Sequence, residues 1–333
     1  MTSSKPSLLE VSKTTKGVFI LGCGGGGDII QTIPVMNYLR HLGVEQFVLG
    51  EYCIKWWDKP GFVPFGCEII NLDRLQPSVR LNDNAVLVNA DTIIERGDSE
   101  VQPESSQGTA LYEAVVAKET GMPVVSINVA NGAQGILSGI KDVMEKYDLD
   151  TFITVDIGAD AFYTGEETSV QSPLADAFSL YVANELNGYY ALTGYACDAE
   201  VPNAHLDVTV GKVMAAGGYL GAHGLTHEDV ADLTKVLDYF PDEAVEMWPR
   251  DAAQGKLGTH YCKGLWHMYV GPLAAVTMFF DSVKVSDVNP IVAAIADTTT
   301  LYDAEQAILE NFNIIPESRL PMEVPVPTKP QIR

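Results

Sequence analysis

A run of glycines near the N-terminus is the first place where residue type and spacing could do chemistry. Gly22, Gly24 and Gly27 have the spacing Gly-x-Gly-x-x-Gly, directly after a short apolar stretch that predicts a strand over 17–21. Backbone without Cβ atoms can turn sharply, and its N–H groups, with the start of a following helix, can hold a phosphate or carboxylate. We therefore predict a loop that binds an anionic small molecule, formed by Gly24, Gly25, Gly26 and Gly27. The alternative is a turn that is rich in glycine only for tight packing.

Two acidic residues bear on the kind of ligand that this loop could take. Glu51 ends the second predicted strand, where dinucleotide-binding folds place a carboxylate that holds a ribose hydroxyl. This keeps NAD(P) open as a cofactor. Asp28 follows the glycines at once, and a carboxylate beside a pyrophosphate is repulsive unless a cation lies between them. Asp28 therefore makes NAD(P) the less favoured ligand, unless Asp28 is only a favourable charge at a helix start.

A second group of acidic residues follows the predicted strand over 151–155. Asp156 and Asp160 come directly after this strand, and Asp176 lies in the first turn of a helix that begins at Ser172. Clustered carboxylates can bind Mg²⁺, hold a sugar hydroxyl or act as a general base. We predict all three aspartates as catalytic residues, and Asp156 and Asp160 as ligands of Mg²⁺ if the protein uses a metal.

Further polar and glycine positions at strand and helix ends are predicted to line the same ligand site. Together with Asp28 they are Asn131, Gly132, Gly158, Ser172, Thr193 and Gly194. Each of them has an ordinary alternative role in a turn or a helix cap.

Strand and helix patterns alternate along the chain and must position these residues. Apolar strands are predicted at 17–21, 46–49, 85–89, 124–129, 151–155 and 189–193. Strands that are apolar on both faces favour a parallel sheet with helices on both sides, which is a doubly wound, Rossmann-like α/β fold. The carboxyl ends of parallel strands meet at one edge, so the glycine loop and the aspartates are expected there together.

The domain organisation follows from the same pattern. We predict a flexible leader over 1–16, one Rossmann-like domain over 17–315, and a surface tail over 316–333. The part of the domain over about 200–270 is expected to be mostly helical. Pro34 predicts a delayed or kinked start of the first long helix, because proline lacks an N–H group.

Composition limits the partners and the location. The chain has 333 residues, of which 47% are hydrophobic, and its 21 Lys and Arg against 44 Asp and Glu give a net charge of −23. This charge opposes binding to nucleic acid. No apolar run is long enough to span a membrane, so we expect a cytoplasmic protein without a membrane partner; a homo-oligomer stays open. Five scattered cysteines without a C-x-x-C pair predict reduced thiols and no metal–thiolate site.

Three motifs in fixed order resemble a known family. They are LGCGGGGD at 21–28, VDIGAD at 155–160 and SPLADA at 172–177, and similar segments continue at 217–226 and 277–281. In this order they resemble the prokaryotic family called domain of unknown function 1152, over residues 17–315. The resemblance implies the α/β fold and the importance of these motifs, and it implies no reaction.

Three functions are compatible with these residues. The first is an enzyme that transfers or hydrolyses a group on a phosphorylated or nucleotide-like small molecule, with the anion on the glycine loop and Mg²⁺ or a hydroxyl on Asp156 and Asp160. The second is an NAD(P)-dependent oxidoreductase, and the third is a non-catalytic module that binds a nucleotide or metabolite.

Overall fold

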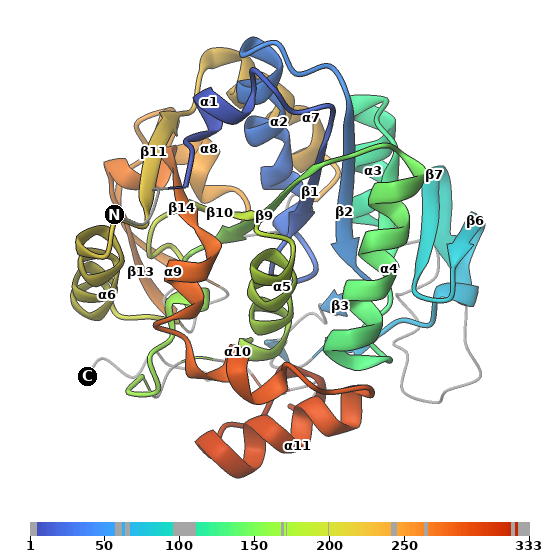
Figure 1. The fold of residues 1–333 in the computed structure, drawn as a ribbon. Helices are drawn as coiled ribbons and strands as arrows, with labels where there is room; N and C mark the ends of the chain where they lie inside the picture. The colour runs from blue at the N-terminus through green and yellow to red at the C-terminus, as the bar shows by residue number, and fades with distance from the viewer. Residues whose placement is uncertain are drawn as a thin grey trace.

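A nine-stranded sheet runs through the protein in the order β11-β14-β10-β9-β1-β2-β8-β7-β6 (Figure 1). The computed structural model describes residues 5–56, 62–63, 67–95, 111–167, 170, 172–198, 200–240, 245–262, 266–320 and 324–325. The five central strands run parallel: β1 (Val18–Gly22), β2 (Phe47–Tyr52), β8 (Val124–Ile127), β9 (Thr151–Ile157) and β10 (Tyr189–Thr193). The predicted α/β, Rossmann-like fold is confirmed.

Both ends of the sheet carry antiparallel strands. These are β14 (Val276–Asp281) and β11 (Tyr219–Gly224) beside β10, and β7 (Ala85–Ile94) and β6 (Leu75–Asn82) beside β8. The strand predicted at 85–89 therefore forms, but it is not part of the parallel set. The reason is that Asn82 pairs with Ala85 across a two-residue turn, and so short a connection joins only antiparallel strands.

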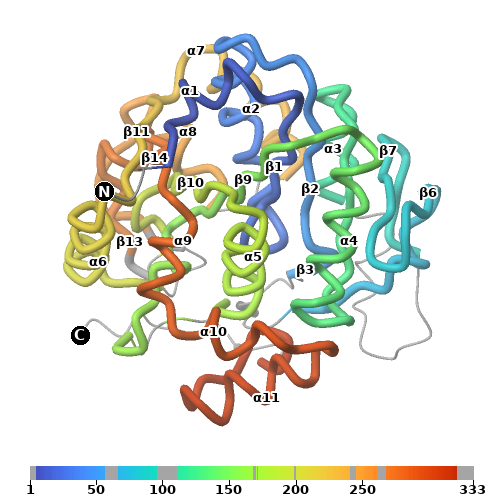
Figure 2. The backbone as a smooth tube through the Cα atoms, viewed as in Figure 1, coloured from blue at the N-terminus to red at the C-terminus, as the bar shows by residue number. Residues whose placement is uncertain are grey.

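Helices cover both faces of the sheet (Figures 1 and 2). One face packs on α2 (Thr32–His41), α3 (Tyr112–Thr120) and α7 (His227–Leu237). The other packs on α4 (Gly132–Lys146), α5 (Pro173–Glu185), α9 (Ser282–Ser286), α10 (Pro290–Ile295) and α11 (Leu301–Phe312). Strand β1 shows why both faces must be covered: Phe19 and Leu21 pack with the second group of helices, Val18 and Ile20 with the first, and all four are fully buried.

The chain after the glycines enters α2 late, as Pro34 predicted. A 3₁₀ turn, η1 (Asp28–Gln31), comes first, and α2 begins at Thr32. Pro34 thus lies in the first turn of the helix, where its missing N–H has no intrahelical partner to lose.

The chain beyond residue 200 alternates helices with strands. The helix α6 (Asn203–Ala215) ends before Gly217, which takes a positive φ of 78°, and the next residues form β11. The remaining elements of this part are α8 (Trp248–Ala253), the hairpin of β12 (Gly258–Cys262) and β13 (Trp266–Val270), and η5 (Pro272–Ala275). None of the helices in the described part of the chain is long and apolar enough to cross a membrane.

Short elements fill the outer parts of the fold. They are α1 (Leu8–Val11), β3 (Ile54–Trp56), β4 (Phe62–Val63), β5 (Cys67–Ile69), η2 (Leu72–Arg74), η4 (Asp160–Phe162), η6 (Glu317–Arg319) and β15 (Val324–Pro325). β3 pairs with β5, and β4 pairs with β15.

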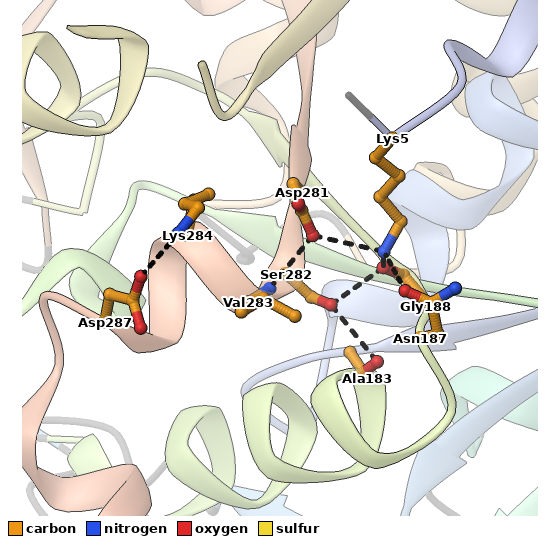
Figure 3. A network of polar contacts seen from close by, with 9 residues as sticks. All are labelled: Lys5, Ala183, Asn187, Gly188, Asp281, Ser282, Val283, Lys284 and Asp287. Atoms are coloured by element: carbon orange, nitrogen blue, oxygen red, sulfur yellow. Dashed lines mark hydrogen bonds and ion pairs between the residues drawn. The ribbon is translucent and has the colours of Figure 1, made fainter. Parts of the chain in front are cut away.

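The described part of the predicted flexible leader, residues 5–16, packs against the sheet. Leu8 of α1 is buried, and the Lys5 ammonium donates to Asp281 Oδ1 at 3.2 Å, to Asn187 Oδ1 at 3.3 Å and to the carbonyl of Gly188 (Figure 3). All three N–H donors of the ammonium are used. Burial lowers the pKa of Lys5, and the nearby Asp281 partly offsets this effect.

Replacing Lys5 by alanine is expected to lower the free energy of unfolding by about 2 kcal/mol, because Asp281 and the Gly188 carbonyl lose their partner in a largely buried place. Chemical denaturation measures this change. The matched control is Lys16→Ala, whose pair with Asp148 is 63% and 76% exposed and should change stability by less than about 0.5 kcal/mol. Equal effects of the two substitutions would contradict an anchoring role for Lys5.

The predicted surface tail begins with a buried carboxylate. Glu317 is 1% exposed and accepts the N–H groups of Leu174 at 3.2 Å and Ala175 at 2.8 Å. It thereby caps the start of α5, where free N–H groups need an acceptor. The remaining tail residues, 321–323 and 326–333, and residues 1–4 of the leader lie outside the described part.

Candidate functional site

The order of the strands creates a topological switch point at the centre of the sheet. β2 pairs with one side of β1 and β9 with the other, and Gly22 at the end of β1 lies beside Val155 of β9. The chain leaves β1 toward α2 on one face, while α5 follows β9 on the other face. In open α/β sheets, two loops that diverge in this way form a crevice between them, and ligands bind in this crevice. The glycine loop and Asp156 are therefore neighbours in space, as the sequence predicted.

The chain's own side chains approach the backbone of the glycine loop closely. A Cβ atom on Gly24 would come within 2.5 Å of Asp28 Oδ2, one on Gly26 within 2.8 Å of the Trp56 ring, and one on Gly27 within 2.1 Å of Glu246 Oε1. Gly26 also has a positive φ of 85°. The glycines are thus required by the packing of this loop, whatever ligand it holds.

Two N–H groups of the loop and of the turn after it already hold carboxylates of the chain. The Gly24 N–H donates to Asp28 Oδ2 at 2.6 Å, and the Ile29 N–H donates to Glu51 Oε2 at 2.8 Å. The other oxygen of Glu51 accepts the Tyr52 N–H at 2.9 Å, and Glu51 is 1% exposed. Glu51 is therefore committed to fixing the loop, and its burial leaves it out of reach of a ribose hydroxyl.

Three potential ligand atoms meet where β1, β9 and α5 converge. The Cys23 Sγ atom and one carboxylate oxygen each from Asp156 and Asp176 all lie within 4.8 Å of one another, and all three residues are buried. Neither oxygen of Asp176 has a hydrogen-bond partner apart from the Cys23 thiol beside it. An unpartnered carboxylate that is 1% exposed is costly to bury, and a cation is the group that would satisfy it.

Asp156 is held in place by its neighbours. Its Oδ2 atom accepts a hydrogen bond from the Tyr190 hydroxyl of β10, and the Ala161 N–H lies at 3.4 Å. Burial raises the pKa of Asp156 to about 6, although the Tyr190 hydrogen bond acts in the opposite direction. Tyr190 therefore favours the charged form of the carboxylate that it orients.

A second acidic group lies next to the first. The Ser172 Oγ atom is 2.9 Å from Asp160 Oδ2 and 3.0 Å from Glu200 Oε1. One hydroxyl proton cannot serve both acceptors, so satisfying both contacts requires a proton on one of the two carboxyl groups. Burial, followed by the charges of Asp176 and Asp156, raises the pKa of Asp160 well above its usual range. Asp160 is thus the natural carrier of this proton.

The whole site is strongly acidic. The pKa values of Asp28, Asp176 and Asp198 are raised, mainly by burial and then by the charges of neighbouring carboxylates. Within the described ranges, no Lys or Arg forms an ion pair with these three residues, with Asp156 or with Asp160. A bare anion would be repelled here, whereas a cation would offset the charge.

Exposure increases from the centre of the site to its rim. Cys23, Asp156 and Asp176 are buried, while Asp28 and Asp198 are only partly buried as whole residues, although Asp198 Oδ2 is a buried oxygen without a hydrogen-bond partner. Close packing at the rim accounts for the glycine at position 158, because a Cβ atom there would come within 2.1 Å of Asp198 Oδ2.

The structure separates the remaining predicted residues into neighbours of the site and residues with local roles. Thr193 ends β10 and Gly194 follows it, and the N–H of the neighbouring Gly158 donates to the Thr193 carbonyl at 3.0 Å. Asn131 is exposed and bonds to Asn84 at 2.6 Å, and Gly132 packs on the backbone of Thr298. The contacts of Asn131 and Gly132 thus show that these two residues form a local turn.

Sequence reasoning included Ser172 among the residues that line the site, and it missed three contributors. Cys23, Tyr190 and Glu200 were not predicted as site residues. Ser172 stands at the N-cap of α5 as expected, but its hydroxyl makes no cap bond because it contacts Asp160 and Glu200. Glu200 lies seven residues beyond β10, so the strand-end rule that found Asp156 could have found it.

The family is decided by a match that covers most of the chain. Residues 19–323 match the family described as "Protein of unknown function (DUF1152)". The chain belongs to this family. The match confirms the resemblance seen in the sequence, and it spans every carboxylate of the site. No curated protein and no solved structure matches this DUF1152 protein significantly.

Proposed function

We propose that this DUF1152 protein is a divalent-cation-dependent enzyme that hydrolyses or transfers a group on a phosphorylated or nucleotide-like small molecule. The observation that carries the proposal is the buried Asp176 carboxylate, whose two oxygens lack an N–H or O–H partner beside Asp156. A divalent ion there would satisfy both aspartates. It would also provide the positive charge that an anionic substrate needs at so acidic a site.

Each residue has a role that its surroundings support. Asp156 and Asp176 would hold the cation, which would supply positive charge to the substrate phosphate and ease the loss of a proton from the attacking water. The oxygen of the attacking water, or of an acceptor hydroxyl, loses its proton to solvent and forms a bond to phosphorus, and the bond from phosphorus to the leaving oxygen breaks. Asp160, protonated in its contact with Ser172, gives its proton to the leaving oxygen.

The glycine loop has a narrower part in this proposal than the sequence predicted. The N–H of Gly24 already holds Asp28, so the substrate phosphate is bound mainly through the cation, with the loop as one wall. A nicotinamide cofactor is less well supported, because Glu51 is buried and turned toward backbone N–H groups.

The test is release of inorganic phosphate from a panel of nucleotides and sugar phosphates, with and without Mg²⁺, Mn²⁺ or Zn²⁺. We expect cation-dependent turnover that Asp156→Asn lowers by more than about 100-fold, because a cation ligand is lost. Asp148→Asn, which changes a carboxylate that is 76% exposed, is the matched control and should leave turnover unchanged. Binding without product would favour a non-catalytic module. Turnover that survives both chelation of cations and Asp156→Asn would contradict the proposal.

Replacing Tyr190 by phenylalanine is expected to weaken cation binding by about 10- to 100-fold, because Asp156 loses the hydroxyl that orients it. Isothermal titration with the divalent ion measures this effect. Tyr195→Phe is the control, since the Tyr195 hydroxyl donates to Asp207 at 2.6 Å instead. If the two variants bind the ion equally well, Tyr190 does not support a cation ligand.

A further inference from the structure

The third member of the central cluster is a thiol. Cys23 is 0% exposed and its Sγ atom lies within 4.8 Å of two carboxylate oxygens, so it is an unusual neighbour for a site that serves only a hard, oxygen-preferring ion. Cys53, Cys67 and Cys197 are also buried and free, yet no such cluster is formed around them in the described part of the chain. The thiol is therefore singled out by its position.

We propose that the site binds a thiophilic divalent ion such as Zn²⁺ or Fe²⁺, and not Mg²⁺, with Cys23 Sγ, Asp156 and Asp176 as its ligands. Thiolates are ligands of zinc and iron, whereas Mg²⁺ takes oxygen ligands and keeps several waters. One thiolate and two carboxylates carry three negative charges, of which a divalent ion offsets two. This set of three protein ligands leaves a fourth position of a tetrahedral ion for water or substrate.

The spacing of the three atoms suits an ion of this size. Metal–ligand bonds of about 2.0–2.3 Å at tetrahedral angles place the ligand atoms roughly 3.5 Å apart. The atoms here lie within 4.8 Å of one another, so small side-chain rotations bring them onto an ion. Because Asp176 has no other hydrogen-bond partner except the Cys23 thiol, it can turn without losing a bond to the rest of the protein.

The ligands come from separate parts of the fold, each of which is firmly held. Cys23 directly follows β1, and its N–H donates to the Val155 carbonyl at 2.8 Å. Asp156 is fixed by Tyr190, and Asp176 lies in the first turn of α5, whose N–H groups are capped by Glu317. A site on such supports is preorganised for metal binding.

This inference rests on the cation site of the proposed function, but it is tested without turnover. The full-length protein, freed of metal, is titrated with Co²⁺, which replaces Zn²⁺ and gives a thiolate-to-cobalt absorption band in the near ultraviolet. We expect this band in the wild-type protein at one equivalent of Co²⁺. We also expect its loss when Zn²⁺ is added, and no loss when Mg²⁺ is added in excess.

Two variants assign the band to a residue. Cys23→Ser should remove the band and weaken Zn²⁺ binding by at least 100-fold, while Cys53→Ser, which changes another buried cysteine, should keep both. Circular dichroism checks that both variants are folded. Co²⁺ binding by the wild-type protein without a thiolate band, or the same band in Cys23→Ser, would overturn the inference.

The wild-type titration decides the matter even if Cys23→Ser does not fold. Metal bound through Cys23 with no turnover on any phosphorylated substrate would reject the proposed function and keep this inference. Mg²⁺-dependent turnover without a cobalt–thiolate band would keep the proposed function and reject this inference.

Discussion

Replacing Asp176 by asparagine is expected to stabilise the cation-free protein while abolishing its response to divalent ions. Asp176 is 1% exposed, and burial and the charge of Asp156 raise its pKa well above the usual range. An asparagine has nearly the same shape, carries no charge, and its NH₂ group can donate to the carboxylates beside it. We expect the free energy of unfolding to rise by about 1–3 kcal/mol without cation.

The opposite effect is expected when the divalent ion is present. At 100 times its Kd, an ion that binds only the folded protein stabilises the wild type by about 2.7 kcal/mol, and Asp176→Asn should gain almost none of this. Turnover should fall by more than about 100-fold. Thermal unfolding with and without the ion, together with a phosphate-release assay, measures all three quantities.

The control for this prediction is a carboxylate outside the site. Asp148→Asn should change neither the stability without cation by more than about 0.5 kcal/mol nor the response to the ion, because Asp148 is exposed. If Asp176→Asn destabilises the protein and leaves the response to the ion intact, Asp176 is a structural residue, and the cation site is rejected.

A more stable protein without the ion and a lost response to the ion would have one physical explanation. The acidic cluster is a source of strain without a cation, since like charges are held together away from water. Such strain is typical of functional sites, where groups are placed for a ligand and not for stability. A purely structural role for Asp156 and Asp176 would instead require partners within the protein, which Asp176 lacks apart from Cys23.

The location of the site could be predicted from the sequence because it depends on a local rule. Strand β9 ends near Asp156 and β1 ends at Gly22, and both strands are apolar stretches that a reader of the sequence can recognise. The carboxyl ends of neighbouring parallel strands meet at one edge, so the glycine loop and the aspartates had to be close. The α/β fold follows from the same alternation of strands and helices.

The composition of the site could not be predicted because it depends on contacts between distant residues. The sequence predicts Asp156 and Asp160 as metal ligands, whereas the three potential ligand atoms that lie within 4.8 Å of one another belong to Asp156, Asp176 and Cys23, and Asp160 contacts Ser172. The absence of a C-x-x-C pair led us to expect no metal–thiolate site. That rule detects only cysteines close in sequence, and it is silent about a thiol such as Cys23 that meets carboxylates from other elements.

The strand order at the edges of the sheet could not be predicted from the sequence for a similar reason. β14 lies between β10 and β11 although it follows both in the chain. The spacing of apolar residues predicts strands but not their order in the sheet. The cap that Glu317 places on α5 comes from a distant segment, because Glu317 is 142 residues beyond its partner Ala175. Both features depend on the pairing of distant segments.

The stability of the cation-free protein is expected to fall as the pH rises from about 5 to 8. Burial raises the pKa of Asp156 from 3.8 to about 6 and that of Glu317 from 4.5 to about 7. Between its unfolded and its folded pKa, each group binds more protons in the folded protein, so stability is present at low pH and is lost as the pH rises. Each shift corresponds to on the order of 3 kcal/mol.

The loss should continue above pH 7, because the pKa values of Asp28, Asp160 and Asp176 are also raised. The melting temperature without cation is expected to fall by on the order of 10 °C between pH 5 and pH 8. A divalent ion should remove much of this fall, because it binds the deprotonated ligands and its affinity grows as they lose their protons.

Two controls separate the buried groups from the general acidity of the chain. Glu317→Gln keeps an oxygen for the α5 N–H groups but cannot titrate, so it should flatten the curve between about pH 4.5 and 7. High salt should leave the fall largely unchanged, because salt screens exposed charges far more than buried ones. A melting temperature that stays constant or rises from pH 5 to 8 without cation would show that these carboxyl groups are already neutralised by partners, and the case for a cation would then lose its electrostatic basis.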